Sequence, residues 1–111
     1  MTNKWDDLIK NKSEELDLPF DWLWIKAQMQ QESNFNEKAK SSCGAIGLLQ
    51  IMPSTASMPE KELFNPEINV KFGIRYLLAQ YIHFPEIPEQ IEKIRFALAS
   101  YNGGRGWVNK A

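Results

Sequence analysis

Glu32 is the residue whose type and position most clearly suggest catalysis in this chain. The apolar residues before it recur at alternating spacings of four and three, which predicts the buried face of an amphipathic helix: Leu18, Trp22, Ile25 and Met29. Glu32 takes the next position on that face. Burial raises the pKa of a carboxyl group, and an acid that keeps its proton near neutral pH can act as a general acid. The alternative, a helix that ends before Glu32 and leaves it in solvent, fits the periodicity equally well.

The elements around Glu32 are predicted to be helices, because the apolar residues recur at helical spacing. A first helix, capped by Thr2 or Asn3, is expected to end before Leu18. Asp21 is a plausible cap for the second helix, which carries Glu32. Residues 34–43 are polar and predict a loop. Residues 44–52 are apolar and interrupted by glycine, which predicts a short helix packed close to a neighbouring backbone.

The second half of the chain is expected to contain two longer helices. Residues 53–63 predict a loop with at most one helical turn. Asn65-Pro66-Glu67 is a helix-start signal, with a capping side chain, a proline and then an acid. A last full helix is expected from about Pro88 to Gly103-Gly104, where the glycines would end it. The tail, residues 105–111, predicts the start of a further helix. The expected fold class is therefore all-α, with five or six helices.

Length and composition point to an ordinary globular domain. The 111 residues suit one domain, 1–111, with 43% hydrophobic and 24% charged residues. A formal net charge of -1 gives no electrostatic reason to expect nucleic acid as a partner. The sequence contains no apolar run of membrane-spanning length, so no membrane insertion is expected. No secretory signal is recognisable at the N-terminus.

The single cysteine and the single histidine limit other chemistries. Cys43 cannot form an intramolecular disulfide, because it has no second cysteine to pair with. One Cys and one His also exclude a zinc site built from several such ligands, and neither a metal nor another cofactor is expected. A nucleophilic pair of Cys43 and His83 is formally possible, but no known signature surrounds either residue.

Three short blocks follow one another along the chain. They are Gln-Glu-Ser-Asn-Phe at residues 31–35, Gly-Ala-Ile-Gly-Leu-Leu-Gln-Ile-Met-Pro at 44–53, and Ala-Ser-Tyr-Asn-Gly-Gly at 99–104. In this order they resemble the lytic transglycosylase family, in its soluble-type (SLT), goose-type-lysozyme-like branch. Ser100 stands where alanine is more usual in the third block. The resemblance covers about residues 26–108 and implies a compact lysozyme-like helical domain.

The resemblance implies a lyase that cleaves the β-1,4 bond between N-acetylmuramic acid and N-acetylglucosamine in peptidoglycan. Glu32 would first protonate the glycosidic oxygen and then act as base, while the muramyl ring closes on itself to a 1,6-anhydro sugar. The acid inventory agrees with a single-carboxylate mechanism, because ordinary glycosidases use two carboxylates. No Asp follows Glu32, and the later Glu residues lie in predicted loops or on exposed helix faces. Glu37, the nearest of them, is expected in a solvated loop.

The family's substrate-binding positions carry over with an alternative for each. Tyr101 would donate its hydroxyl to Glu32 or to the substrate's acetamido group, or it is a core tyrosine. Gln50 would bond the sugar next to the scissile bond, or it bonds backbone. Ser33 would help position Glu32 or the acetamido group, or it bonds its own backbone. Asn102 would bind substrate or shape a turn, and Met52 would line the cleft or fill a gap.

The resemblance also sets expectations for partner and location. The expected partner is the glycan strand of peptidoglycan, and the domain is expected to be a monomer acting on the cell wall. Family domains usually continue past residue 111, so the domain is expected to be truncated at its C-terminus. Without a signal sequence, the protein is expected to be phage-encoded, virion-associated, part of a secretion apparatus or a domain of a longer protein. A hydrolase on the same fold and a non-catalytic peptidoglycan-binding module are the alternative functions.

Overall fold

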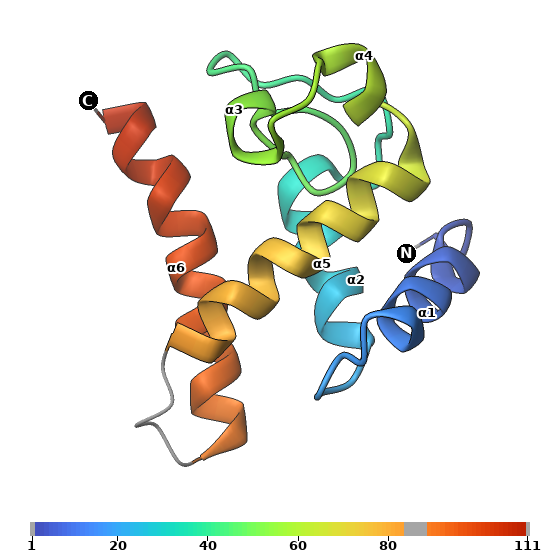
Figure 1. Cartoon of the computed structure of the whole chain (residues 1–111), viewed down its shortest axis with the longest axis vertical. Coiled ribbons are helices and arrows are strands. Elements are labelled where there is room, and N and C mark those ends of the chain that lie inside the picture. Colours follow the sequence, from blue (N-terminus) through green and yellow to red (C-terminus); the bar gives the residue numbers. More distant parts are fainter. Residues whose placement is uncertain (1, 84–88, 111) are drawn as a thin grey trace. The chain divides into compact units, whose positions relative to one another are not determined.

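The protein is a chain of helices. The computed structural model describes the backbone of residues 2–83 and 89–110 and the side chains of residues 2–82 and 89–101. Over this part of the chain we find six helices and no β-strand, apart from two isolated bridges, which confirms the predicted all-α class (Figure 1). The helices are α1 (Asp6–Glu15), α2 (Leu23–Ser33), α3 (Pro53–Ala56), α4 (Glu60–Leu63), α5 (Pro66–His83) and α6 (Gln90–Lys110).

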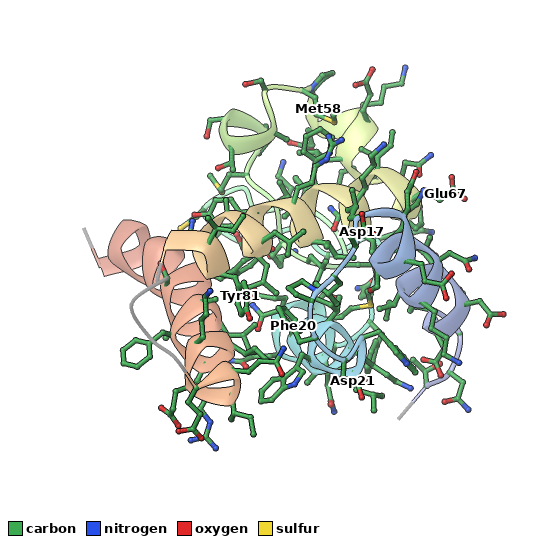
Figure 2. The ribbon with its side chains drawn as sticks, turned by 60° about the horizontal axis from the view of Figure 1, so that its bottom comes forward. Asp17, Phe20, Asp21, Met58, Glu67 and Tyr81 are labelled. Atoms are coloured by element: carbon green, nitrogen blue, oxygen red, sulfur yellow. The ribbon has the colours of Figure 1, made fainter. Side chains whose placement is uncertain are left out.

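Two helix starts follow their sequence signals. Asp21 (Figure 2) lies one residue before the N-cap position of α2, which Trp22 occupies, and its Oδ1 accepts a hydrogen bond from the Leu23 amide at 2.9 Å. Asn65 Oδ1 accepts one from the Glu67 amide at 2.9 Å at the start of α5. Each side chain satisfies a backbone donor that the first helical turn leaves unpaired. The expected cap at Thr2 or Asn3 is wrong, because α1 begins at Asp6 without a side-chain cap.

Three other expectations need correction. Residues 44–52 are a turn, not a helix, because Gly44 (φ +92°) and Gly47 (φ +77°) adopt left-handed backbone that a right-handed helix cannot contain. The expected loop at residues 53–63 contains two single-turn helices, α3 and α4. The helix expected to stop at Gly103-Gly104 continues to Lys110 as α6. Each glycine costs a helix only about 1 kcal/mol relative to alanine, which is too little to end it here.

The chain divides into two compact units, and the boundary falls within α5. The first unit spans Met1–Ile74 and contains α1 to α4 and the first half of α5. Its core is built from apolar side chains of α1, α2, the 44–52 turn, α4 and α5. The fully buried members are Ile9, Ile25, Met29, Ile46, Leu48, Leu49, Leu63, Val70 and Ile74.

The second unit spans Arg75–Ala111 and contains the second half of α5 and all of α6. Leu77, Ile94, Ala97 and Tyr101 are its buried apolar residues. Within the described parts of the chain, none of the helices is sufficiently long and apolar to cross a lipid bilayer.

Candidate active site

The last turn of α2 carries Glu32. Ile25 and Met29 are 1% and 0% exposed, so the predicted apolar face of this helix is buried, and α2 continues through Ser33 instead of ending early. Leu18 and Trp22 lie before the first helical residue, so the helix is shorter than the apolar pattern suggested. Glu32 is half-buried, and its Oε1 is enclosed, with less than 1 Å² in contact with solvent. Glu32 thus follows the buried face of α2 and is itself only partly buried, less than its place in the apolar pattern indicated.

Gln28 contacts the Glu32 carboxyl group directly. Its Nε2 donates a hydrogen bond to Glu32 Oε2 at 2.7 Å, and Gln28 itself is only 4% exposed. The two side chains meet because residues four apart lie on the same face of a helix. Sequence analysis missed Gln28, although its spacing of four from Glu32 was the signal that could have found it. The hydrogen bond fixes the orientation of the carboxyl group relative to α2.

Ser33 joins α2 to the glycine-containing turn. Its Oγ lies 2.8 Å from the Leu48 carbonyl oxygen and 3.2 Å from the Met29 carbonyl oxygen of its own helix. The shorter contact crosses between two segments that are 15 residues apart in sequence. Ser33 therefore does more than bond its own helix, which was one of the two expectations. It anchors the residue after Glu32 to the turn.

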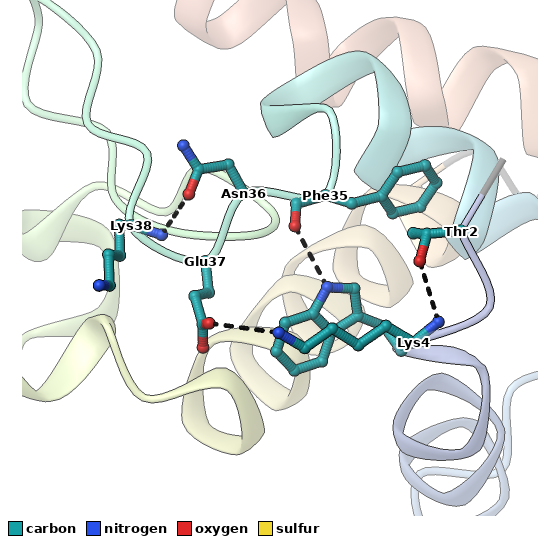
Figure 3. Close-up of polar contacts among 7 residues, drawn as sticks. Thr2, Lys4, Phe35, Asn36, Glu37 and Lys38 are labelled. Carbon is teal, nitrogen blue, oxygen red and sulfur yellow. Dashed lines mark hydrogen bonds and ion pairs between the residues drawn. The ribbon is translucent and has the colours of Figure 1, made fainter.

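α2 ends abruptly after Ser33. Asn34 (φ 52°) and Phe35 (φ 64°) are both in left-handed backbone, which is unusual for an aromatic residue and reverses the chain direction. The Phe35 carbonyl oxygen accepts a hydrogen bond from the Trp5 indole at 3.2 Å (Figure 3). Strained backbone of this kind persists only where surrounding contacts hold it. The segment before α1 supplies one such contact to the end of α2.

The loop after Phe35 is held by further polar contacts. Lys4 forms an ion pair with Glu37 at 3.7 Å, and Asn36 Oδ1 accepts a hydrogen bond from the Lys38 amide at 3.0 Å (Figure 3). Glu37 and Lys38, together with Phe64, line an open surface hollow of about 510 Å³. Glu37, the acid nearest to Glu32 in sequence, is thus a surface residue paired with a lysine.

The turn at residues 46–51 is closed by backbone hydrogen bonds and by one side chain. The amides of Ile46 and Ile51 each donate to the other's carbonyl oxygen at 2.9 Å. The buried Asn69 side chain, from α5, accepts a hydrogen bond from the Leu49 amide at 2.8 Å. Sequence analysis missed Asn69, because its partners are distant in sequence and no local pattern marks it.

Gln50 is buried in the turn, at 5% exposure, with φ 51°. Its Nε2 donates to the carbonyl oxygens of Gly47 at 2.9 Å and Ala39 at 3.3 Å. Both amide protons are therefore used on backbone, which was the alternative expectation, and only Oε1 can serve a ligand. Met52 follows in extended backbone and is half-buried just before α3.

Tyr101 belongs to the second unit. It is 3% exposed on α6, and its ring packs edge-on against Tyr76 of α5, with centroids 5.0 Å apart and an interplanar angle of 85°. The neighbouring Ser100 donates a hydrogen bond to Gln80 at 2.7 Å, so the serine that replaces the usual alanine ties α6 to α5. The side chain of Asn102 lies outside the described residues.

The six predicted site residues thus fall into two groups. Glu32, Ser33, Gln50 and Met52 lie in the first unit, where Ser33 bonds α2 to the turn that carries Gln50. Tyr101 and Asn102 lie in the second unit. Among the residues with described side chains, no three His, Cys, Asp or Glu residues gather closely enough to hold a metal ion.

Comparison with known proteins identifies the family. The model of the transglycosylase SLT domain matches residues 10–111. The chain is 39% identical over 109 residues to membrane-bound lytic murein transglycosylase F of Vibrio parahaemolyticus, covering 97% of this chain and 20% of that protein. It is 40% identical over 109 residues to the protein of the same name from Vibrio vulnificus, with the same coverage. The chain therefore spans about a fifth of the length of these relatives.

Solved structures agree with the sequence comparison. The 70-kDa soluble lytic transglycosylase of Escherichia coli is similar, with a TM-score of 0.76 and 32% identity, over 96% of this chain and 18% of that one. A 70-kDa soluble lytic transglycosylase in complex with bulgecin A gives a TM-score of 0.75 and 32% identity, over 88% of this chain and 16% of that one. The fold is of the lysozyme-like type that these enzymes share, and the chain belongs to the transglycosylase SLT domain family.

Proposed function

We propose that residues 1–111 form one catalytic domain, a peptidoglycan lytic transglycosylase. Its reaction cleaves the β-1,4 bond between N-acetylmuramic acid and N-acetylglucosamine and leaves a 1,6-anhydromuramyl product. Family membership supports the proposal, as do relatives named for lytic activity on murein. The matched region, residues 10–111, covers most of the first unit and all of the second, which supports treating them as one domain.

The observation that carries the proposal is the setting of Glu32. A half-buried carboxyl group with one enclosed oxygen is partly shielded from bulk water, which suits a group that transfers a proton to and from a bound glycan. The hydrogen bond from Gln28 to Oε2 holds the group in one orientation. A proton donor fixed in this way needs no reorganisation when the glycosidic oxygen develops negative charge.

The reaction proceeds in two proton transfers. Glu32 gives its proton to the glycosidic oxygen as the bond to the anomeric carbon breaks, and the substrate's N-acetyl oxygen stabilises the positive charge at that carbon. The Glu32 carboxylate then takes the proton of the muramyl C6 hydroxyl, whose oxygen attacks the anomeric carbon. The ring closes to the 1,6-anhydro sugar and Glu32 regains its proton, so one residue acts first as acid and then as base.

The acids that follow Glu32 in the first unit support a mechanism with one carboxylate. Glu37 pairs with Lys4 at 3.7 Å, and Glu60 pairs with Lys40 at 3.0 Å. The remaining acids of this unit after Glu32 are exposed to solvent, namely Glu62 and Glu67. An ordinary glycosidase would need a second carboxylate close to the scissile bond. The intramolecular hydroxyl and the N-acetyl group of the substrate replace it here.

Five residues are proposed to bind the substrate. Ser33 positions Glu32 through its bond to the turn. Gln50 accepts a hydrogen bond from a sugar through Oε1, since its amide protons are used on backbone. The family blocks alone support the other three, which are Met52 along the glycan, Tyr101 as a donor to the acetamido group and Asn102 beside it. The glycan strand of the cell wall is the partner.

The experiment is a digest of purified peptidoglycan by the domain, with products weighed by mass spectrometry and Glu32→Gln as the control preparation. A 1,6-anhydromuramyl product, one water lighter than the hydrolytic product, is expected from the parental domain and not from the control. A hydrolytic product would overturn the proposal in favour of a lysozyme-type hydrolase. Intact glycan strands would overturn it in favour of a non-catalytic binding module.

A further inference from the structure

Asn69 is the only polar residue among the largest fully buried side chains of the described chain. It is 0% exposed and lies in the first turn and a half of α5. Its Oδ1 accepts a hydrogen bond from the Leu49 amide at 2.8 Å. Its Nδ2 donates to the carbonyl oxygens of Ile46 at 2.7 Å and Leu63 at 2.9 Å. Every hydrogen-bonding group of this amide except the second lone pair of its oxygen is used.

These three bonds replace secondary structure. The Leu49 amide lies in the turn and the Leu63 carbonyl oxygen lies at the last residue of α4, whereas the Ile46 carbonyl oxygen also accepts from the Ile51 amide. A buried backbone donor or acceptor without a partner is costly, so some side chain must satisfy it. Asn69 fixes two residues of the turn at once and ties both to the end of α4.

Gly47 makes room for the Asn69 amide. A Cβ atom at position 47 would lie 2.5 Å from Nδ2 of Asn69 and 3.2 Å from the Leu63 carbonyl oxygen. Gly47 also has φ +77°, which disfavours any side chain. Only glycine at position 47 leaves room for the Asn69 side chain. Gly47 and Asn69 therefore determine the shape of the turn together.

The 44–52 turn also contacts the end of α2. Leu48 lies between the two residues that Asn69 anchors, and its carbonyl oxygen is the one that Ser33 Oγ approaches at 2.8 Å. Ser33 follows Glu32 in the last turn of α2. A short series of contacts thus runs from Asn69 through the turn to Ser33, within the first unit.

We propose that Asn69 is a positioning residue for Glu32, which it serves by holding the Leu48 carbonyl where Ser33 needs it. The inference rests on the proposed function, in which Glu32 is the acid and base of glycan cleavage. If Asn69 is lost, the turn keeps its Ile46–Ile51 backbone bonds, but the side-chain bonds to Leu49 and Ile46 on either side of Leu48 are gone. The end of α2 then samples more orientations, and fewer of them place Glu32 for proton transfer.

The test compares Asn69→Ala with Asn65→Ala, which removes a helix-capping asparagine four residues earlier on the exposed start of α5. Both variants are expected to fold with reduced stability. At temperatures where both are folded, Asn69→Ala is expected to lower kcat by about tenfold to hundredfold, as misplacement of a reacting group does. Asn65→Ala is expected to keep the parental kcat. Equal kcat values in the two variants would overturn the proposal.

A double-mutant cycle with Ser33→Ala checks the route. If Asn69 acts through Ser33, the double variant is expected to lose little more kcat than Asn69→Ala alone. Losses in kcat that multiply would overturn this route. If Asn69→Ala does not fold, Asn69→Ser takes its place in the comparison with Asn65→Ala. Serine keeps a shorter polar group at this position.

A measurement that does not depend on catalysis separates the role of Asn69 from the proposed function. Hydrogen exchange at the Leu49 amide is expected to be protected in the parental domain and in Asn65→Ala, and to be fast in Asn69→Ala. Protection that persists in Asn69→Ala would overturn the positioning role even if glycan cleavage is observed. A parental domain that leaves glycan strands intact would overturn the proposed function, and the role of Asn69 in catalysis with it, whatever the exchange result.

Discussion

Glu32 and Gln28 lie one helical turn apart on α2, so the helix itself sets the geometry of the carboxyl group. The 2.7 Å bond from Gln28 to Oε2 needs only the two side chains and the regular backbone between them. A buried donor at this position also limits the rotation of the acid about its last side-chain bond. At the scale of single residues, the candidate acid is therefore held by its own helix on one side and through Ser33 by the turn on the other.

Glu32→Gln keeps the size of the side chain and removes its ionisable proton. Turnover is expected to fall about a hundredfold or more, as for the loss of other general acids. The free energy of unfolding is expected to hold or rise, because a neutral amide replaces a poorly solvated acid. Product release from peptidoglycan measures turnover, and a thermal melt of the same preparation measures stability. Near-parental cell-wall clearance by this variant would contradict the assignment of Glu32 as the acid.

Gln28→Leu removes the donor to Glu32 Oε2 and keeps a side chain of similar bulk. We expect kcat to fall several-fold and KM to change little, because the interaction orients the acid and does not contact the glycan. Gln30→Leu is the matched control, since Gln30 is exposed on the same helix. Steady-state kinetics on glycan strands measure both variants. If the two variants have the same kcat, the hydrogen bond from Gln28 plays no part in catalysis.

At the scale of elements, α1 is fastened to α2 by a shielded ion pair. Lys26 Nζ lies 2.8 Å from Asp6 Oδ1 and 3.3 Å from Asn3 Oδ1, and its side chain is only 9% exposed. Asp6 also stands at the first turn of α1, where a negative charge complements the helix dipole. The helix that carries Glu32 therefore depends on residues that precede the region matched by the family model.

Asp6→Ala removes the carboxylate that pairs with Lys26. The Lys26 ammonium group then stays shielded from water with no opposite charge beside it. We expect the free energy of unfolding to fall by about 1–3 kcal/mol, the cost of an unsatisfied buried charged group, with Asn3 offsetting part of it. Glu15→Ala is the control, because it breaks the more exposed Lys12–Glu15 pair of the same helix. Exposed pairs contribute only about 0–1 kcal/mol. Denaturant unfolding curves that give the two variants equal stability would show that the Asp6–Lys26 pair is no stronger than a surface pair.

The sequence allowed the helices to be predicted but not the turn. Local signals mark where α2 and α5 begin: Asp21 accepts a hydrogen bond from the first amide of α2, Asn65 caps α5, and the apolar spacing follows. The turn at residues 44–52 looked helical because it is short and apolar, whereas its shape depends on Asn69, about 20 residues later. Gly47 marked a close approach, although its nearest neighbour is the Asn69 side chain, whereas Gly44 has no neighbour within 4 Å of the place of a Cβ atom. The periodicity of apolar residues carries no information about hydrogen bonds between residues that are distant in sequence.

At the scale of the whole molecule, the three family blocks are divided between two compact units. The blocks at residues 31–35 and 44–53 lie in the first unit, and the block at residues 99–104 lies in the second. The order of these blocks along the chain predicted the family, which the comparisons confirm. Among the proposed site residues, Glu32 was supported by the local apolar pattern as well as by a family block. The roles of all six are predictions. In the second unit, the role of Tyr101 can be tested most directly.

Tyr101→Phe keeps the ring, and with it the edge-on packing against Tyr76 at 5.0 Å. The free energy of unfolding is expected to change by only about 1 kcal/mol, the net contribution of one hydrogen bond. Turnover is expected to fall substantially, because a hydroxyl that binds the acetamido group contributes most when charge develops in the transition state. Tyr76→Phe is the matched control, since it removes a hydroxyl from the other ring of the pair and is expected to keep the parental turnover. Unchanged turnover per folded molecule in Tyr101→Phe, with lowered stability, would instead make Tyr101 a core residue of the second unit and leave Glu32 to act without it.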